Sequence, residues 1–298
     1  MLRHKVTEGK TMFRICLRIL RHVRLLQFWL HWEVFRQPPF RARYRKFDVF
    51  YHRGDLLMSR FATTGAYEPR VMAFVQKNLR DDAVVIDVGA NIGLFLFGVL
   101  SACPKSIVHA FEPSPIPRQL LRASISANRV ERRITLNETA LYSHTGEMEF
   151  CVHRDTTSAL DGLRDTAYEV AGNTETIKVP VSTLDQYIKQ HPLARVDLLK
   201  LDVEGAELFV LKGGRNLLKD LSPMVLFEVG RINLRPYGLV PRNIFEFLCE
   251  CGYEVTTLSG HLLDATQFDL AVDVENEFVA VPRAKPIPAT READLELV

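Results

Sequence analysis

The sequence of 298 residues contains few cysteines, and their spacing excludes two common ways of stabilising a small fold. The five cysteines are odd in number and scattered, which fits neither a disulfide framework nor a structural zinc site. We therefore expect reduced thiols and a cytoplasmic protein. No combination of histidine, cysteine and aspartate has the spacing of a catalytic zinc site, so no metal site is predicted, although metal dependence stays open.

Long uninterrupted apolar runs are also missing. The most apolar segment, residues 13–35, contains Arg14, Arg18, Arg21 and Arg24. Several arginines at bilayer depth cost too much free energy, which excludes a membrane span. The apolar stretches between them are too short for a signal peptide, and no cleavage site of small residues follows.

Charge is unevenly spread, although the net charge is only +2. Residues 1–60 hold 14 basic and four acidic residues, whereas the remainder holds 24 basic and 32 acidic ones. The acidic body argues against an extended nucleic-acid-binding surface. At helical spacing residues 13–35 place arginines on one side and apolar residues on another. Such a helix suits packing on its own domain, self-association, or peripheral contact with an anionic membrane, and these alternatives stay open.

The signatures of two enzyme classes are absent. There is no G-x-S-x-G motif, and His153 with Ser158 nearby is one histidine near a serine rather than a triad. Both residues lie in a segment expected above the ligand crevice, so they are candidate substrate contacts. A Tyr-x-x-x-Lys proton donor is also missing, which argues against an NAD-dependent oxidoreductase.

Segments typical of buried strands alternate with helical segments from residue 84 onwards. Strands separated by helices at this spacing form βαβ units, so we predict an α/β fold with a mostly parallel sheet covered by helices on both faces. The expected strands cover residues 84–89, 106–113, 134–141, 196–205, 223–230, 253–260 and 276–283, and the expected helices cover residues 92–101, 117–130, 185–191, 206–220 and 241–252. Residues 146–152 and 176–184 are expected to form a hairpin-like insertion.

A glycine-spaced turn follows the first of these strands, in VVIDVGANIGLFLF. Gly89 and Gly93 suit a tight strand-to-helix turn at which backbone approaches a ligand. Asp87 would repel a pyrophosphate, but it can meet an ammonium group. Asn91 stands where the dinucleotide-binding motif has its middle glycine. The turn therefore favours S-adenosylmethionine, which carries an amino acid and a sulfonium, over a dinucleotide.

Glu112 ends the next strand, nineteen residues after Gly93. An acid at that place accepts hydrogen bonds from ribose hydroxyls, which fits NAD and S-adenosylmethionine equally well. The following strand ends in a polar stretch that can contact an adenine edge. Asn137 and Ala140 are the candidates there, although an ordinary strand terminus explains them nearly as well.

A second group of acids occurs in VDLLKLDVEGAE, residues 196–207. Asp202 falls at the carboxyl end of a strand and faces the same crevice as Asp87, so it is the first candidate for a catalytic base. Glu228 ends the next strand and is the second. The acids at 204 and 207 also suit the start of a helix. Arg231 and Tyr237, in the loop that follows Glu228, are candidate substrate contacts.

Taken together, these segments resemble the FkbM family of S-adenosylmethionine-dependent methyltransferases over about residues 62–282. The resemblance rests on GAYEP, DVGANIG, AFEPSP, ETALYSHTGEMEF, TTSAL, VPVSTLDQYI, VDLLKLDVEGAELFVLKGG and NEFVAVP, in that order. It implies a Rossmann-like class I methyltransferase domain, set here at residues 61–283. A basic helical extension, residues 1–60, would precede it, and a loose tail, residues 284–298, would follow.

The resemblance also implies roles for individual residues. The cofactor contacts that it implies are Asp87, Gly89, Asn91, Gly93 and Glu112, with Glu68 near the methionine end and Asp202 beside the methyl donor. Members of the family mostly methylate hydroxyls on sugars, glycolipids or small metabolites, so we expect O-methylation by in-line transfer. An NAD-dependent oxidoreductase and a membrane-docked binding protein are the alternatives.

Overall fold

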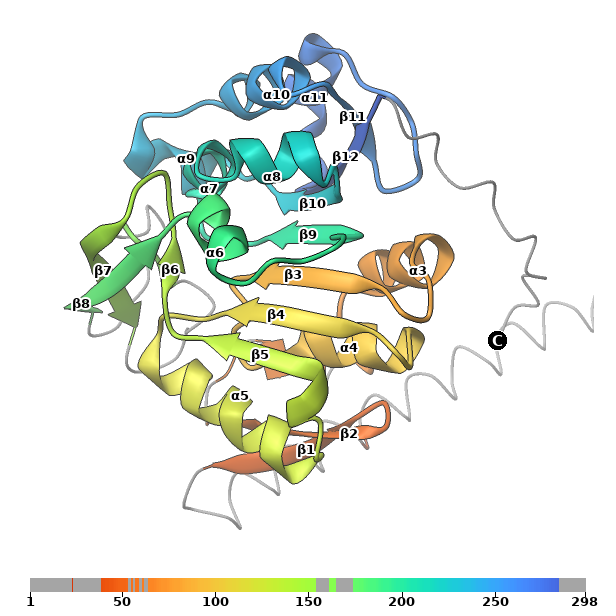
Figure 1. The fold of residues 1–298 in the computed structure, drawn as a ribbon, viewed down its shortest axis with the longest axis vertical. Coiled ribbons are helices and arrows are strands. Elements are labelled where there is room, and N and C mark those ends of the chain that lie inside the picture. The colour runs from red at the N-terminus through yellow and green to blue at the C-terminus, as the bar shows by residue number, and fades with distance from the viewer. Residues whose placement is uncertain are drawn as a thin grey trace, which may run out of the picture.

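The computed structural model of the protein describes residues 23, 39–52, 55, 57–58, 61, 64–153, 161–164 and 174–283. Their centre is a seven-stranded sheet (Figure 1). Its strands, in spatial order, are β11 (Tyr253–Thr257), β12 (Glu277–Pro282), β10 (Met224–Glu228), β9 (Leu198–Leu201), β3 (Val84–Val88), β4 (Ile107–Phe111) and β5 (Ile134–Asn137). Within this sheet, as far as the structure describes it, β12 runs antiparallel to both of its neighbours and all other pairs are parallel. The predicted α/β fold with a mostly parallel sheet is confirmed.

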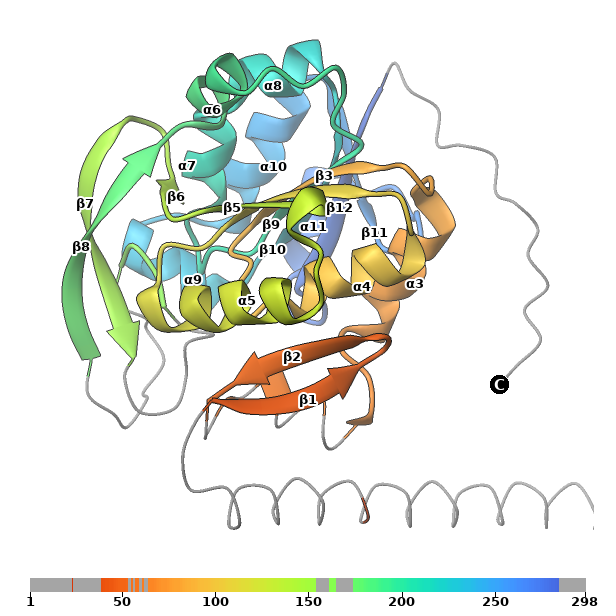
Figure 2. The ribbon, with the colours of Figure 1, turned by 60° about the horizontal axis from the view of Figure 1, so that its bottom comes forward.

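Helices cover both faces of the sheet, as Figure 2 shows. One face carries α3 (Pro69–Asn78), α4 (Leu94–Ala102) and α5 (Pro115–Ala127). The other carries α6 (Leu184–Gln190), α7 (Glu207–Lys212), α8 (Arg215–Asp220), α10 (Pro241–Glu250) and α11 (Ala265–Ala271). On β3, Val85 packs toward the first layer and Ile86 toward the second, because successive strand residues point to opposite faces. Burial on both sides explains why the central strands are mostly apolar.

The predicted helix over residues 206–220 is two helices in the structure, α7 and α8. The chain breaks at Gly213 and Gly214 because neighbouring elements approach too closely for side chains. A β carbon on Gly213 would lie 2.1 Å from the backbone oxygen of Tyr142, and one on Gly214 would lie 2.7 Å from Leu184 Cδ1. Two short elements complete this layer, namely α9 (Arg231–Leu234) and a 3-10 turn, Arg235–Tyr237. A further 3-10 turn, Glu131–Arg133, precedes β5.

The predicted insertion is a three-stranded sheet beside the main one. It consists of β6 (Ala140–Leu141), β8 (Thr174–Ser182) and β7 (Gly146–His153), in that order. The long strands β7 and β8 pair antiparallel, with Gly146 opposite Val181 and His153 opposite Thr174. The sheet lies at the end of the main sheet where the parallel strands finish (Figure 1), and so it overhangs the site described below.

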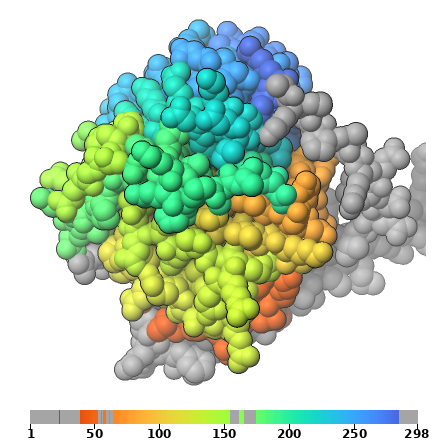
Figure 3. Space-filling view, in the orientation of Figure 1, coloured from red at the N-terminus to blue at the C-terminus, as the bar shows by residue number. Residues whose placement is uncertain are grey.

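The structure differs from the expected helical extension at residues 40–51, which form an antiparallel hairpin. Its strands are β1 (Phe40–Tyr44) and β2 (Phe47–Tyr51). Alternate residues of β2 are buried, and the ring of Phe47 lies 5.2 Å from that of Phe97 on α4. The backbone N–H of Phe50 donates to Ser124 Oγ at 2.9 Å, which ties the hairpin to α5. Figure 3 shows the hairpin at the lower edge of the folded body.

The amphipathic segment over residues 13–35 and the tail over residues 284–298 lie outside the described residues, apart from Val23. Their predicted roles stay predictions, as does the boundary at residue 60. None of the helices in the described part of the chain combines the length and the apolar character needed to cross a bilayer.

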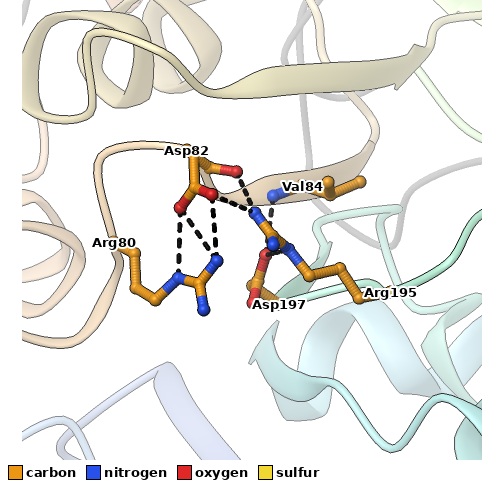
Figure 4. Close-up of polar contacts among 5 residues, drawn as sticks. All are labelled: Arg80, Asp82, Val84, Arg195 and Asp197. Carbon is orange, nitrogen blue, oxygen red and sulfur yellow. Dashed lines mark hydrogen bonds and ion pairs between the residues drawn. The ribbon is translucent and has the colours of Figure 1, made fainter.

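At the amino ends of β3 and β9, charged side chains bind the two strands together (Figure 4). Asp197 Oδ2 accepts hydrogen bonds from the backbone N–H of Val84 at 2.8 Å and from Arg195 Nε at 3.0 Å. Arg195 also pairs with Asp82, which in turn binds Arg80. This network fixes the register of β3 and β9 at the end opposite the site, so that their carboxyl ends stay aligned.

Candidate active site

A pocket opens at the carboxyl ends of β3, β4 and β9. The strand order reverses here, because the chain leaves β3 toward β4 and β5 on one side and returns to β9 and β10 on the other. The pocket encloses about 420 Å³, including its open mouth. It is lined by Val88, Gly89, Phe111, Glu112, Pro113, Ala140, Leu141, Phe150, Asp161, Gly162, Leu163, Asp202, Val203 and Ala206.

Asp87 lies on β3, directly before the lining residues Val88 and Gly89. Its side chain is fully buried, and both carboxylate oxygens accept no hydrogen bond from any described residue. Its nearest cation is Lys200, whose Nζ lies 3.8 Å from Oδ1. Burial raises the pKa of Asp87 to about 6, with Lys200 opposing the rise. A buried carboxylate without a donor is costly, so Asp87 is poised to receive one.

Among the described residues, Lys200 is the cation that lies against Asp87 and Asp202. It stands opposite Asp87 in the β3–β9 register, and its Nζ donates to Asp202 Oδ2 at 2.9 Å. The ring of Phe95 covers the ammonium group, with its centroid 5.1 Å away. Burial alone would lower the pKa of Lys200, but the negative charges of Asp202 and Asp87 outweigh it and hold the pKa above its ordinary value.

Glu68 and Glu228 extend the acidic group. Glu68 precedes α3 with a left-handed backbone, φ 38°, and burial raises its pKa to about 7 while Lys200 lowers it. Glu228 ends β10, and its Oε1 accepts a hydrogen bond from Asn276 Nδ2 at 2.6 Å. Burial raises its pKa as well, and so does the charge of Asp202. Acids therefore outnumber the single lysine among them.

The glycine turn brings β3 against β9. Gly89 has φ 83°, and a β carbon there would lie 1.8 Å from the backbone oxygen of Asp202. The N–H groups of Gly89 and Ala90 both donate to the Phe111 oxygen, which fastens the turn to β4. Asn91 follows with φ 48°, and Gly93 directly precedes α4. The turn thus leaves no side chain between the ends of β3 and β9.

Glu112 sits at the end of β4 and is buried. Its Oε2 accepts the backbone N–H of Asn91 at 2.7 Å, and its Oε1 accepts that of Ser114 at 2.8 Å. Burial raises the pKa of Glu112 to about 8, although the two N–H donors oppose the rise. Each carboxylate oxygen can accept a second hydrogen bond, so the group can still bind hydroxyls from a ligand.

The turn after Asp202 is held by its own acids. Glu204 has φ 53°, unusual for a residue other than glycine, and its Oε2 accepts from Asn233 Nδ2 at 2.7 Å. Glu207 Oε1 accepts the backbone N–H groups of Val203 at 3.0 Å and Gly205 at 3.3 Å. Glu207 therefore fixes the loop that carries Asp202 and does more than favour a helix start.

The structure does not bring every predicted residue to the pocket. Asn137 donates through Nδ2 to the backbone oxygen of Ala110, whereas Ala140 does line the pocket. Arg231 binds Asp269 and Asp273 with its guanidinium and lies outside the pocket lining. Asp269 on α11 and Asp273 just after it hold the guanidinium there, so the structure does not place Arg231 at the pocket.

The other three predicted substrate contacts are not among the described residues that line the pocket. His153 turns its backbone N–H and ring toward Asp161 and is not among the lining residues. Tyr237 packs its ring beside Gly205, and its buried hydroxyl has no hydrogen-bond partner among the described residues. Ser158 lies outside the described residues.

Sequence reasoning did not find Ser114 and Asp161, and it gave Lys200 no role. Lys200 carried a signal, because residues i and i+2 of a strand share a face and Asp202 follows at that spacing. Ser114 and Asp161 carried none, since their contact joins a helix start to a loop of the insertion, and no periodicity encodes that. Among the described residues no group of three or more His, Cys, Asp or Glu side chains is arranged to hold a metal ion.

Comparison with known proteins identifies a family. The model of the methyltransferase FkbM domain matches residues 87–255, which is more than half of the chain and includes most of the site. The 31-O-demethyl-FK506 methyltransferase FkbM of Streptomyces tacrolimicus is 33% identical over 159 residues, covering 45% of this chain and 60% of that protein. The hexuronic acid methyltransferase AglP of Haloferax volcanii is 27% identical over 197 residues, covering 64% of this chain and 73% of that protein.

A solved structure is also similar. The crystal structure of methyltransferase FkbM from Methylobacillus flagellatus KT aligns with a TM-score of 0.43 at 18% identity, covering 74% of this chain and 52% of that one. The present chain thus spans about half the length of that protein and 60% of the Streptomyces relative.

Proposed function

The chain belongs to the FkbM family of methyltransferases, and from this premise we propose that it binds S-adenosylmethionine in the pocket at the ends of β3, β4 and β9. When bound, this cofactor supplies a methyl group on a positively charged sulfonium. The acceptor is a hydroxyl group of a sugar, a glycolipid or a small metabolite. The name of one relative, an O-demethyl-FK506 methyltransferase, supports methylation on oxygen, and that of another, a hexuronic acid methyltransferase, supports a sugar acceptor.

The observation that carries the proposal is the unsatisfied carboxylate of Asp87. Two buried oxygens without a hydrogen-bond donor among the described residues suit an ammonium group, which offers three. The surrounding acids, with Lys200 as their cation, favour a positively charged ligand and disfavour a pyrophosphate. The residues present therefore fit the amino-acid end of S-adenosylmethionine.

Glu112 would hold the nucleoside end. Its oxygens are fixed by two backbone N–H groups and keep capacity for ribose hydroxyls. The left-handed turn at Gly89 and Asn91 would let the cofactor approach the backbone. Glu68, near Lys200 and Asp202, would lie toward the methionine end.

The catalytic base is drawn from Asp202 and Glu228. A hydroxyl is a poor nucleophile at neutral pH, so a carboxylate within hydrogen-bond reach would take its proton as attack proceeds. Asp202 lines the pocket and is the first candidate. The ion pair with Lys200 holds its side chain in one orientation. Glu228, fixed by Asn276, is the second candidate.

Calorimetry tests cofactor binding directly. S-adenosylhomocysteine and sinefungin should bind the wild-type protein, whereas NADH should not. Asp87→Asn should raise the Kd of S-adenosylhomocysteine and of sinefungin at least tenfold. Binding of NADH in place of the two analogues would refute the proposal.

A methyl-transfer screen tests the acceptor class. The panel contains methyl glycosides of neutral and uronic sugars, a glycolipid, small alcohols, and matched amines and carboxylic acids, with and without EDTA. Transfer to hydroxyl probes is expected, and transfer only to amines or carboxylates would exclude O-methylation of a hydroxyl. Asp202→Asn should leave cofactor binding largely intact and lower turnover strongly; unchanged turnover would remove Asp202 from the mechanism.

A further inference from the structure

Residues 161–164 of the insertion lie against the pocket from above. Gly162 exchanges two backbone hydrogen bonds with Cys151 of β7, at 2.7 and 3.1 Å, which fixes the segment to the small sheet. Asp161, Gly162 and Leu163 all line the same pocket as Glu112 and Asp202. The insertion therefore contributes a wall to the site, and that wall carries a carboxylate.

Asp161 is held in place by contacts from two separate elements. Its Oδ2 accepts a hydrogen bond from Ser114 Oγ at 2.6 Å, and its Oδ1 accepts the backbone N–H of His153 at 2.8 Å. The side chain is only 3% exposed. The ring Nδ1 of His153 also lies 3.4 Å from Oδ1. The capacity for a further hydrogen bond therefore lies on Oδ2, which has a second lone pair.

Ser114 connects Asp161 to Glu112. The backbone N–H of Ser114 donates to Glu112 Oε1, while its hydroxyl donates to Asp161. One residue at the start of α5 thus positions two carboxylates at the same end of the pocket. Because the two acids repel each other, the charge of Asp161 contributes to the raised pKa of Glu112.

Other polar side chains near this end are engaged elsewhere. Glu138, just after β5, is about half exposed and pairs with Arg118 and Arg122 on α5. Asn137 donates to the backbone of Ala110. Among the polar residues that line the pocket, Asp161 is therefore the partner of Glu112 at the end where a nucleoside would lie.

We propose that Asp161 is a further cofactor-binding residue, a second carboxylate that accepts a hydrogen bond from the nucleoside and that Ser114 sets beside Glu112. The proposal rests on the proposed function, because it takes the ligand to be S-adenosylmethionine. Its hydrogen-bond donor is either a ribose hydroxyl or the exocyclic amine of the base. Ser114 and His153 are positioning residues that act through Asp161.

Calorimetry of wild type, Asp161→Ala and Asp161→Asn with S-adenosylhomocysteine tests the assignment. Asp161→Ala should raise the Kd about tenfold or more, as expected for loss of a charge-assisted hydrogen bond. Glu149→Ala, an exposed acid on β7 of the same insertion, is the matched control and should leave the Kd unchanged. Ser114→Ala should raise the Kd by a smaller factor, and circular dichroism establishes that each variant is folded.

Nucleoside analogues separate a direct contact from a structural effect. Adenosine, inosine, 2′-deoxyadenosine and 3′-deoxyadenosine are titrated into wild type and Asp161→Asn. If Asp161 contacts the base, the variant loses discrimination between adenosine and inosine. If it contacts the ribose, discrimination against one deoxynucleoside disappears instead.

Two outcomes overturn the assignment. Wild-type affinity in both Asp161 variants would do so, and so would an equal loss for all four nucleosides, because a purely structural residue weakens every ligand alike. If the wild-type protein itself fails to bind S-adenosylhomocysteine, the proposed function falls first, which keeps the two failures distinct.

Discussion

Asp87 and Lys200 face each other across the ladder between β3 and β9, with Oδ1 and Nζ 3.8 Å apart, too far for a direct hydrogen bond. Lys200 instead donates to Asp202 at 2.9 Å. The lysine thus balances part of the negative charge around Asp87 without satisfying its oxygens. A pocket built this way is charge-stabilised when empty and still receptive to a second cation.

Removal of the lysine should therefore destabilise the empty protein in a pH-dependent manner. Lys200→Met leaves buried carboxylates without their counterion, which typically costs about 3–5 kcal/mol of unfolding free energy. The loss should be largest at pH 8 and smaller at pH 5, where the acids take up protons. Urea unfolding at both pH values measures it. Lys178→Met, on the exposed face of β8, is the control, and an equal loss in the two variants would contradict the role given to Lys200.

The turn at Gly89 should not tolerate a side chain. A β carbon would lie 1.8 Å from the Asp202 backbone oxygen, so Gly89→Ala must push β9 away from β3. We expect a loss of about 1–3 kcal/mol or more, together with loss of S-adenosylhomocysteine binding. Gly252→Ala is the matched control, because Gly252 also has positive φ but no atom within 4 Å of a built β carbon. Comparable losses in both variants would show that the positive φ angle, and not the contact with Asp202, accounts for the loss of stability.

The stability of the empty protein should fall as pH rises from about 5 to 8. Burial raises the pKa of Asp87 to about 6, of Glu68 to about 7 and of Glu112 to about 8, all above the values near 4 of an unfolded chain. In this window the folded state binds more protons than the unfolded state, so deprotonation favours unfolding, by at most about 1.4 kcal/mol per pH unit for each group. Thermal unfolding across the range measures this slope. Glu112→Gln should flatten it between pH 6 and 8, and an unchanged slope would contradict the assignment.

Cofactor binding should show the opposite dependence. A cation at Asp87 and hydroxyl donors at Glu112 both favour the ionised carboxylates, so binding releases protons and tightens as pH rises from 6 to 8. Calorimetry of S-adenosylhomocysteine in buffers of different ionisation enthalpy counts the protons. Proton uptake, or a Kd independent of pH, would be inconsistent with raised pKa values in the empty site.

The hairpin over residues 40–51 should behave as part of the core. Phe47 is buried against Phe97, so Phe47→Ala should cost about 3–5 kcal/mol. Arg43→Ala, whose side chain is 61% exposed on β1, should change stability by no more than about 0.5 kcal/mol. Equilibrium unfolding in denaturant compares them. A small effect at Phe47 would mean that the hairpin folds apart from the domain.

Much of the fold was predictable because strand and helix periodicities are local properties. The strand that carries Asp87, the strand that ends just before Asp202 and the insertion all lie where the pattern predicts them. The hairpin was missed because FRARY and FDVFY are short, and because the two arginines of FRARY continue a longer basic segment, which masked the alternation. The break between α7 and α8 was missed because it depends on the close approach of Tyr142 and Leu184, residues distant in sequence.

The site was predictable where its residues end strands, as Glu112 and Asp202 do. The site was not predictable where the role of a residue depends on a contact with another element of the fold. Arg231 was predicted to contact substrate from its loop position, but its guanidinium binds Asp269 on α11 and Asp273 just after that helix. Asp161 had no sequence signal, because only the folded insertion carries it to Ser114.

The placement of β12 has a consequence for synthesis of the protein. Although it leaves the ribosome after all the other described strands, it occupies an internal position between β10 and β11. Until residues 277–282 emerge, both neighbouring strands present open edges to chaperones and proteases. The preceding residue, Asn276, donates to Glu228, so that acid stays without its amide donor until this segment has been synthesised. Completion of the sheet and completion of this part of the active site are thus one event.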